Sequence, residues 1–404
     1  MNILFLTTGR MQSIEQHAIY PDLLRCFRNH GHQIYIVSSY EKRIGRNTEY
    51  LEENGAHMLR VKIGNLTKTN TIEKGISTLL IEKQYLSAVK QYLSNVQFDL
   101  VLYSTPPITL VKVVEYIKER DDCKTYLLLK DIFPQNAVDL GMISTHGVKS
   151  IVYRYFRSKE KKLYAISDFI GCMSQANVEY MLTYNPDIKP EKVEVCPNCI
   201  EVVDASVTEK AKITIRKKYK LPLDKLIFIY GGNLGRPQGI PFLMECRKSL
   251  RKYENIFLLI VGDGTEYSKL KTFIGASEYL NVKLMKHLPK EDYDSMVGAC
   301  DVGMIFLDHR FTIPNFPSRL LAYMQASIPV LACTDPNTDI GNVIVKGGFG
   351  WWCESDNVKG FEFMISEIIK ADLKAMGKNG FNYLKEHYTS EIGYSIIMKY
   401  FENM

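Results

Sequence analysis

The sequence has 404 residues, of which 46% are hydrophobic and 24% charged, and its net charge is +6. This length favours two domains, and the composition is ordinary for a soluble globular protein. The mild positive charge permits an anionic ligand or membrane surface, but without a DNA- or RNA-binding motif it predicts no nucleic-acid partner. Residues 1–9 lack the features of a signal peptide, and no window approaches the roughly 18 apolar residues of a membrane-spanning helix.

The nine cysteines lie scattered among apolar residues, which predicts reduced, buried thiols in a cytoplasmic protein. Cys196 and Cys199 have the spacing of a redox or metal-binding pair, but no second pair completes a zinc site. His17, His287 and His309 form no His-x3-His pair. We therefore predict neither a metal site nor a cofactor.

The first half of the chain alternates apolar strands with helical patterns. A helix is expected over 14–27, where apolar residues recur at helical spacing, and Gly31 ends it. Strands joined by helices and short turns predict a doubly wound parallel sheet. The expected strands are 3–8, 34–38, 100–103, 125–129 and 169–173.

Ligands of such sheets bind outside the carboxyl ends of the strands. Gly9 and Arg10, Thr105, and Asp131 each follow a strand. Gly9 fits either a close backbone approach to a ligand or a simple tight turn. Asp131 either lines a cleft or caps the next turn, and we favour the cleft. Because no GxGxxG fingerprint is present, a nicotinamide cofactor is not predicted.

Residues 148–165 mix aromatic side chains with arginines and lysines. At helical spacing one face is apolar and the other is basic, so this helix is able to rest on an anionic membrane surface. The alternative is a helix that covers the sheet and exposes a solvated charged face. We expect the apolar side to cover the sheet and keep membrane contact open for the basic side.

Residues 196–222 are polar and lysine-rich and are the expected linker. A second α/β domain follows, with helices expected over 239–250 and 290–300. We expect an N-terminal domain over 1–200, a second domain over 201–385, and a C-terminal helix within 386–404 that packs back on the first domain. The strands expected in the second domain are 225–230, 256–261, 282–285, 302–307 and 329–333, and the stretch 350–353 and helices follow them.

The stretch 314–335 combines a proline-punctuated loop, a helix expected to start at the N-cap Ser318, and a buried strand. Backbone N–H groups at a helix start attract anions, and Arg319 adds a full positive charge. Glycine-rich tips at 231–235 and 262–264 allow further backbone approach to phosphates. Together these segments predict a site for a nucleotide-sugar diphosphate at one edge of the second sheet.

Over nearly its whole length the sequence resembles the retaining family 4 glycosyltransferases, in particular those that build bacterial capsular, O-antigen and other surface polysaccharides. The resemblance rests on short motifs that occur in the expected order. The motifs are Lys130-Asp-Ile-Phe-Pro134, Ser174, Pro197-Asn198, Gly231-Gly-Asn-Leu-Gly235, Val261-Gly-Asp-Gly264, Leu288-Pro289, Asp301-Val-Gly303 and Pro317-Ser-Arg319.

The resemblance implies a GT-B fold, in which two Rossmann-like domains face each other across a cleft. It implies transfer of a sugar from a nucleotide diphosphate, UDP in our expectation, with retained configuration and no metal. The acceptor is expected to be a polyprenyl-diphosphate-linked saccharide at the inner face of the plasma membrane. Asp131 and Arg319 are the implied catalytic residues, and Gly9, Arg10 and Thr105 lie on the acceptor side. The implied donor-binding residues are Gly232, Asn233, Gly235, Arg236, Gly262, Gly264, His287, Leu288, Asn315, Phe316, Ser318, Arg319 and Leu320.

The sequence also departs from the family pattern. The two glutamates of its Glu-x7-Glu motif are replaced by Pro314 and Ala322, so another group must hold the ribose of the donor. Asn233 and Gln238 stand near the positions of a basic pair, for which Arg236 is a substitute. Two alternatives therefore stay open: a nucleotide-sugar epimerase of the same architecture, and a non-catalytic protein that binds sugar nucleotides.

Overall fold

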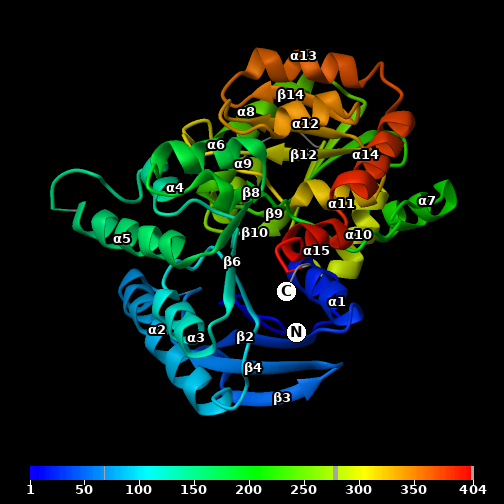
Figure 1. The fold of residues 1–404 in the computed structure, drawn as a ribbon. Coiled ribbons are helices and arrows are strands. Elements are labelled where there is room, and N and C mark those ends of the chain that lie inside the picture. Colours follow the sequence, from blue (N-terminus) through cyan, green and yellow to red (C-terminus); the bar gives the residue numbers. More distant parts are fainter. Residues whose placement is uncertain (68, 149, 276–280, 402–404) are drawn as a thin grey trace. The chain divides into compact units, whose positions relative to one another are not determined.

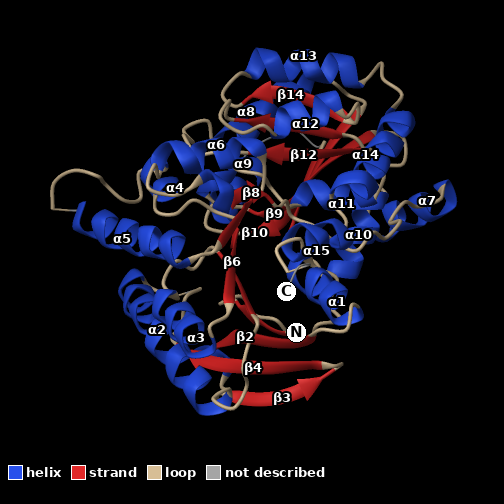
Figure 2. Cartoon of the chain, viewed as in Figure 1, coloured by secondary structure: helices blue, strands red, loops and turns tan. Residues whose placement is uncertain are grey.

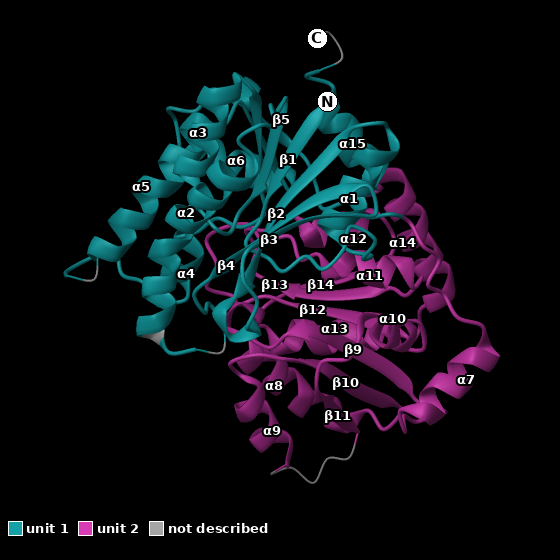
Figure 3. Ribbon diagram, turned by 90° about the horizontal axis from the view of Figure 1, so that it is seen from below, with its two compact units in different colours: residues 1–201, 390–404 teal, residues 202–389 magenta. Residues whose placement is uncertain are grey.

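The computed structural model describes residues 1–67, 69–148, 150–275 and 281–401. The predicted segments 148–165 and 386–404 thus include residues outside the described ranges, namely 149 and 402–404. The chain divides into two compact units, one formed by residues 1–201 with 390–404 and the other by 202–389 (Figure 3). Each unit contains one sheet that helices accompany, as Figures 1 and 2 show. The predicted class, α/β with two Rossmann-like domains, is confirmed.

The sheet of the first unit has eight strands in the order β3-β4-β2-β1-β5-β6-β7-β8, and every neighbouring pair except β3 and β4 is parallel. Its strands are β1 (Asn2–Leu6), β2 (Gln33–Glu41), β3 (Glu49–Glu53), β4 (Ala56–Ile63), β5 (Leu100–Ser104), β6 (Lys124–Leu129), β7 (Phe169–Cys172) and β8 (Val193–Val195). Its helices are α1 (Ile19–Asn29), α2 (Thr71–Tyr92), α3 (Val111–Asp121), α4 (Gln135–Asp139), α5 (Ser150–Ile166), α6 (Gln175–Tyr184) and α15 (Ser390–Met398).

The first helix begins later than predicted. It starts at Ile19 instead of near Ile14, because Pro21 lacks an N–H and is tolerated only in the first turn of a helix. Ile14 is nevertheless fully buried, so its apolar character reflects the core and not a helical face.

Sequence reasoning missed the hairpin of β3 and β4. Its two-residue loop, Asn54-Gly55, has positive φ at both positions, 54° and 70°. Asn-Gly is the typical sequence of such a turn, because both residues adopt the left-handed conformation at low cost. The hairpin adds the one antiparallel pair of this sheet.

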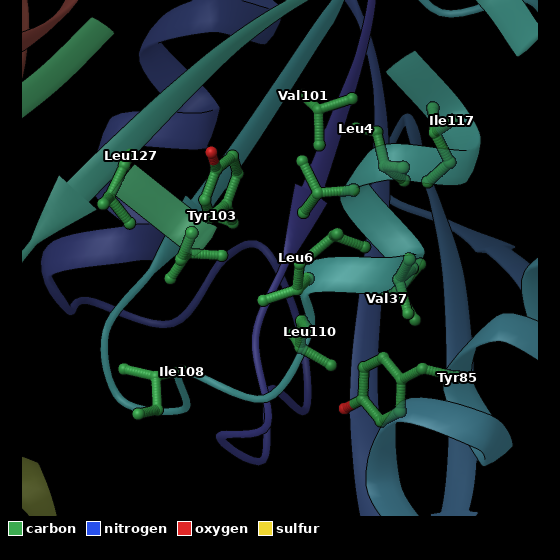
Figure 4. Packing of buried hydrophobic residues seen from close by; sticks show 14 of the residues in the cluster. Leu4, Leu6, Val37, Tyr85, Val101, Tyr103, Ile108, Leu110, Ile117 and Leu127 are labelled. Atoms are coloured by element: carbon green, nitrogen blue, oxygen red, sulfur yellow. The ribbon is translucent and has the colours of Figure 1, made fainter. Parts of the chain in front are cut away.

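One core cluster of the first unit lies between the sheet and α2, α3 and α5 (Figure 4). Leu4 and Leu6 of β1, Val101 and Tyr103 of β5, and Tyr85 of α2 are all at most 1% exposed. A second cluster includes α1 and the C-terminal helix α15, where Ile397 is fully buried. The C-terminal helix therefore completes the core of the first unit.

The second unit has a six-stranded sheet in the order β11-β10-β9-β12-β13-β14, with all neighbours parallel. Its strands are β9 (Leu226–Asn233), β10 (Ile256–Asp263), β11 (Val282–Met285), β12 (Val302–Phe306), β13 (Val330–Thr334) and β14 (Gly350–Glu354). Its helices are α7 (Glu209–Lys218), α8 (Ile240–Ser249), α9 (Tyr267–Gly275), α10 (Lys290–Gly298), α11 (Arg319–Gln325), α12 (Ile340–Lys346), α13 (Val358–Ile368) and α14 (Leu373–His387).

The expected linker 196–222 is not a continuous loop. It contains α7, which Thr208 caps by accepting a hydrogen bond from the N–H of Ala211. The buried Arg216 of α7 pairs with Asp301 at 2.6 Å, next to the start of β12. The lysine-rich composition therefore reflects the solvated face of a helix that belongs to the second unit.

Candidate functional site

The carboxyl ends of β9 and β10 form a glycine-rich tip in the second unit. The ladder between these strands continues through the pairs Gly232–Gly262 and Asn233–Asp263, beyond the strand end predicted at Tyr230. A Cβ on Gly262 would lie 1.9 Å from the carbonyl oxygen of Gly232, and a Cβ on Gly264 would lie 2.4 Å from that of Leu234. These backbones approach so closely that only glycine fits.

Arg319 lies against this tip. Gly232 has φ of +122°, and a Cβ at that position would lie 3.5 Å from Nη2 of Arg319. The guanidinium stacks over the ring of Tyr230, with 4.6 Å between its carbon and the ring centroid. Nη1 is buried and has no hydrogen-bond partner among the described residues. An arginine in this state retains capacity for an anion.

The neighbours of Arg319 are tyrosines. A carboxylate in their place would neutralise its charge. Tyr323, one turn further along α11, donates from its hydroxyl to the carbonyl of Met304 at 3.1 Å, and Tyr293 reaches Gly231 from α10. Burial raises the pKa of Tyr323 to about 12, although Arg319 opposes this rise. These phenols therefore stay neutral, and no ion pair between Arg319 and an acid is present in the described part of the chain.

Of the donor-binding residues predicted in and after the loop before α11, some are buried in the core. Ser318 precedes the helix as predicted, but its side chain makes no capping hydrogen bond. The N–H of Leu320 already donates to the carbonyl of Pro317 at 3.2 Å, and its side chain is fully buried. Phe316 is 6% exposed and packs near Tyr388. Phe316 and Leu320 thus support the loop from the core.

A tight turn after β13 fixes the same loop. Asp335 is fully buried and accepts hydrogen bonds from the N–H groups of Asn337 and Thr338 at 3.0 and 3.2 Å. Thr338 donates to the carbonyl of Asn315 at 2.6 Å, and Asn337 donates to that of Phe311. Burial raises the pKa of Asp335 to about 7, and its Oδ2 has no partner among the described residues.

The remaining predicted donor residues lie at the same edge of the sheet. Gly235 donates from its N–H to the side chain of Gln238, which also accepts from Asn233 at 3.2 Å. Arg236 is exposed at the start of the following turn. His287 and Leu288 follow β11, the strand next to β10. His287 is exposed, and Leu288 is half-buried.

In the first unit the structure brings Thr105 and Asp131 together. The Thr105 hydroxyl donates to the carbonyl of Asp131 at 3.0 Å and accepts from the N–H of Lys130 at 3.1 Å. Both carboxylate oxygens of Asp131 accept from Nδ2 of Asn136 at 2.8 Å. Burial raises the pKa of Asp131 to about 6, although Asn136 opposes this rise.

The other acceptor-side residues differ in exposure. Thr105 is 1% exposed, so its hydroxyl links backbones instead of facing solvent. Gly9 and Arg10 are exposed and follow β1, which is the neighbour of β5 in the sheet. The N–H of Gly9 donates to the Thr7 hydroxyl at 3.0 Å, a contact that fits the tight turn.

Potential metal ligands gather elsewhere in the first unit. Among the described residues, Cys26, His30 and Glu391 form one group and His17, Asp22 and Glu201 form another. Asp22 already forms a salt bridge with Arg25 at 2.6 Å and accepts a hydrogen bond from the N–H of Glu201 at 2.9 Å. These contacts give the second group a structural role. All nine cysteines are free and buried, as predicted.

Sequence reasoning missed the tyrosines around Arg319 and the Asp335 turn. Tyr323 was detectable, because residues four apart on a helix lie on the same face. Tyr230 and Tyr293 come from other elements, so only the folded chain shows their proximity to Arg319. Asp335 carried no signal beyond its place after a buried strand.

Comparison with known proteins finds a family match within the second unit. Residues 211–383 match the model of the family described as glycosyl transferases group 1. The chain is 25% identical over 333 residues to the probable glycosyltransferase WbjE of Pseudomonas aeruginosa, which covers 82% of this chain and 80% of WbjE. It is 26% identical over 160 residues to the putative colanic acid biosynthesis glycosyl transferase WcaI of Escherichia coli K12, which covers 39% of this chain and 38% of WcaI.

Solved structures share the fold over the whole chain. A sucrose-phosphate synthase from Thermosynechococcus elongatus superposes with a TM-score of 0.73 at 15% identity, covering 99% of this chain and 98% of that one. HepE of Anabaena, solved with UDP and glucose, gives 0.71 at 13% identity and covers both chains completely. Residues 211–383 thus match a family of glycosyltransferases, and the likeness to the solved structures shows that the whole chain has the GT-B fold.

Proposed function

We propose that the protein transfers a sugar from a UDP-linked donor to a lipid-linked oligosaccharide acceptor, with retained anomeric configuration, during synthesis of a bacterial surface polysaccharide. The donor diphosphate binds at the tip of β9 and β10 beside Arg319. The acceptor hydroxyl binds at the edge of the first unit that carries Asp131. The acceptor is a polyprenyl-diphosphate-linked saccharide at the cytoplasmic face of the membrane.

Arg319 carries this proposal. Its guanidinium is held against a glycine tip and a tyrosine ring, and no carboxylate in the described residues pairs with it. A preorganised cation that lacks an internal partner is suited to a ligand with concentrated negative charge, such as a diphosphate. Because Leu320 donates its N–H within the turn, Arg319 supplies more of the attraction than the helix start does.

During transfer the bond between the anomeric carbon and the diphosphate oxygen breaks, and its electron pair stays on the diphosphate. The acceptor oxygen forms a bond to the same carbon on the same face of the sugar and loses its proton. Arg319 stabilises the charge that develops on the leaving diphosphate. We assign Asp131 to accept the proton, because its pKa of about 6 leaves it ionised at neutral pH and protonatable.

Two relatives support the finer parts of the proposal. WcaI is named for colanic acid biosynthesis, and HepE was solved with UDP and glucose. The sequence resemblance to the retaining family 4 enzymes supports retention of configuration. The donor ribose needs a partner other than the glutamate that Ala322 replaces.

The test is a panel of nucleotide sugars, each incubated with and without a lipid-linked acceptor, with released nucleotide as the readout. We expect acceptor-dependent release with a UDP-sugar, and Arg319→Ala should lower kcat/KM about 100- to 1,000-fold. Arg319→Lys keeps the charge but loses the planar stack, so it should recover only part of the activity. An unchanged melting temperature would show that Arg319→Ala still folds.

Three results would contradict the proposal or part of it. Conversion of the donor sugar without an acceptor would indicate an epimerase, and binding without turnover would indicate a non-catalytic protein. Near-wild-type kcat/KM in Arg319→Ala would contradict the placement of the donor diphosphate at this tip. The epimerase and the non-catalytic protein stay open as alternatives because Pro314 and Ala322 replace the two glutamates of the family motif.

A further inference from the structure

Asn136 lies in the first turn of α4 and donates to both carboxylate oxygens of Asp131. Its Nδ2 is 2.8 Å from Oδ1 and 2.8 Å from Oδ2. Its backbone N–H donates to the carbonyl of Ile132 at 3.0 Å, so the amide stands on the same turn as the carboxylate. A donor and an acceptor that are fixed to one short turn keep their geometry with little conformational freedom.

The amide of Asn136 fits beside Asp131 in one orientation only. With the amide turned over, its oxygen would face two carboxylate oxygens at 2.8 Å, and all three atoms are acceptors. In the orientation that donates to Asp131, Oδ1 of Asn136 is buried and has no hydrogen-bond partner among the described residues. A buried acceptor without a partner destabilises a fold. Stability alone therefore does not favour an asparagine here, and its contact with Asp131 needs another reason.

The other groups around Asp131 do not take over this task. Burial raises the pKa of Asp131 to about 6, Asn136 lowers it, and the negative charge of Glu160 on α5 raises it further. Glu160 is itself buried and forms a salt bridge with Arg157. Lys130 precedes Asp131 in the chain, but its Nζ donates to backbone carbonyls at 3.2 and 3.3 Å. Asn136 is therefore the main side chain that favours the ionised carboxylate.

We propose that Asn136 is a positioning residue for sugar transfer, which orients the Asp131 carboxylate toward the acceptor hydroxyl and keeps it ionised. The inference rests on the proposed function, in which Asp131 accepts the proton of that hydroxyl. Each carboxylate oxygen has a further lone pair, so the contact with Asn136 leaves room for the proton. Because the amide carries no charge, it fixes the carboxylate without lowering its basicity as far as an arginine would.

The experiment measures kcat/KM for the acceptor against pH in the full-length protein, with the UDP-sugar and lipid-linked acceptor that give turnover in the panel of nucleotide sugars. In the wild type, kcat/KM should fall as pH drops through about 6, because a protonated Asp131 accepts no proton. In Asn136→Leu the ionised carboxylate loses a hydrogen bond. The acid limb of the profile should therefore move up by roughly one to two pH units, and its plateau should fall about tenfold.

A second variant and a matched control accompany Asn136→Leu. Asn136→Ala removes the same donor without placing an apolar side chain against the carboxylate, so its acid limb should move in the same direction. The melting temperature of each variant shows whether it folds. Gln135→Leu is the control, because Gln135 lies in the same helical turn but donates to Asp139 at 2.8 Å and not to Asp131. Its acid limb should stay at the wild-type pH.

A double variant separates positioning from a structural role. Because Asn136 acts through Asp131, Asp131→Asn/Asn136→Leu should have kcat/KM within about twofold of Asp131→Asn alone. A residue that only supports the fold would add its own loss to that of Asp131→Asn. A residue that binds the acceptor directly would do the same.

An acid limb at the wild-type pH in both Asn136 variants would overturn this inference, and so would a further loss in the double variant. Either result leaves the proposed function in place as long as Asp131→Asn itself lowers kcat. Failure of the proposed proton acceptor gives a different result, since Asp131→Asn would then keep the wild-type kcat and its acid limb. The role of Asn136 would be refuted along with it.

Discussion

The carboxyl edges of the two sheets are built in opposite ways. In the second unit, the glycine-rich tip of β9 and β10 meets Arg319, whose charge no described carboxylate balances. In the first unit, Thr105, Asp131 and Asn136 satisfy most of one another's polar groups. One edge therefore retains an unbalanced charge, whereas the other holds a single carboxylate in a defined position.

This difference matches two kinds of substrate. A diphosphate carries fixed negative charge and is attracted by an unpaired cation. A sugar hydroxyl is neutral, so it requires a positioned acceptor for its proton and not a strong field. The functional difference between the two edges would disappear if Asp131 were only structural or if Arg319 were already neutralised. The following predictions test both conditions.

Beyond Arg319→Ala, the largest effect on activity is expected for Asp131→Asn. This change keeps the shape and removes the basic oxygen, so kcat should fall about 100-fold or more while the donor KM stays nearly constant. Steady-state kinetics with varied donor and saturating acceptor measure both. Asp139→Asn, at the end of α4, is the matched control and should retain full kcat. Unchanged kcat in Asp131→Asn would leave this carboxylate a purely structural role.

Gly232→Ala should have the next largest effect, on donor binding. The new Cβ would lie 3.5 Å from Nη2 of Arg319, and φ of +122° disfavours any side chain. We expect the donor KM to rise roughly tenfold, measured by nucleotide release or calorimetry. Gly31→Ala is the control, because Gly31 also has positive φ but no atom lies within 4 Å of its Cβ position. An equal donor KM in both variants would show that Gly232 has no role in donor binding.

The last prediction concerns the pH dependence of stability and not activity. The raised pKa of Asp335, about 7, means that the folded protein keeps a proton which the unfolded chain releases near pH 4. Stability from this group is therefore present below about pH 4 and is lost as pH rises to about 7, at about 1.4 kcal/mol per pH unit. Urea unfolding between about pH 5 and about pH 7 should show this slope in the wild type and a flatter one in Asp335→Asn.

The strand positions in the second unit and the place of Arg319 at a helix start were accessible from sequence because both depend on local patterns. Apolar runs that end in glycine or polar residues located β9 to β13 within a few residues. The roles of Phe316 and Leu320 were not accessible, since an apolar residue next to a ligand and one in the core look alike in sequence. The tyrosine contacts of Arg319 depend on packing between β9, α10 and α11, which no local pattern encodes.

The return of α15 to the first unit has a consequence for synthesis of the protein. Residues 202–389 are continuous in the chain, so the second unit can form its core while translation proceeds. The first unit needs Ile397 against α1, and Ser390 donates its N–H to the carbonyl of Ile200 at 2.9 Å. The half that emerges first from the ribosome is therefore the half whose core is completed last.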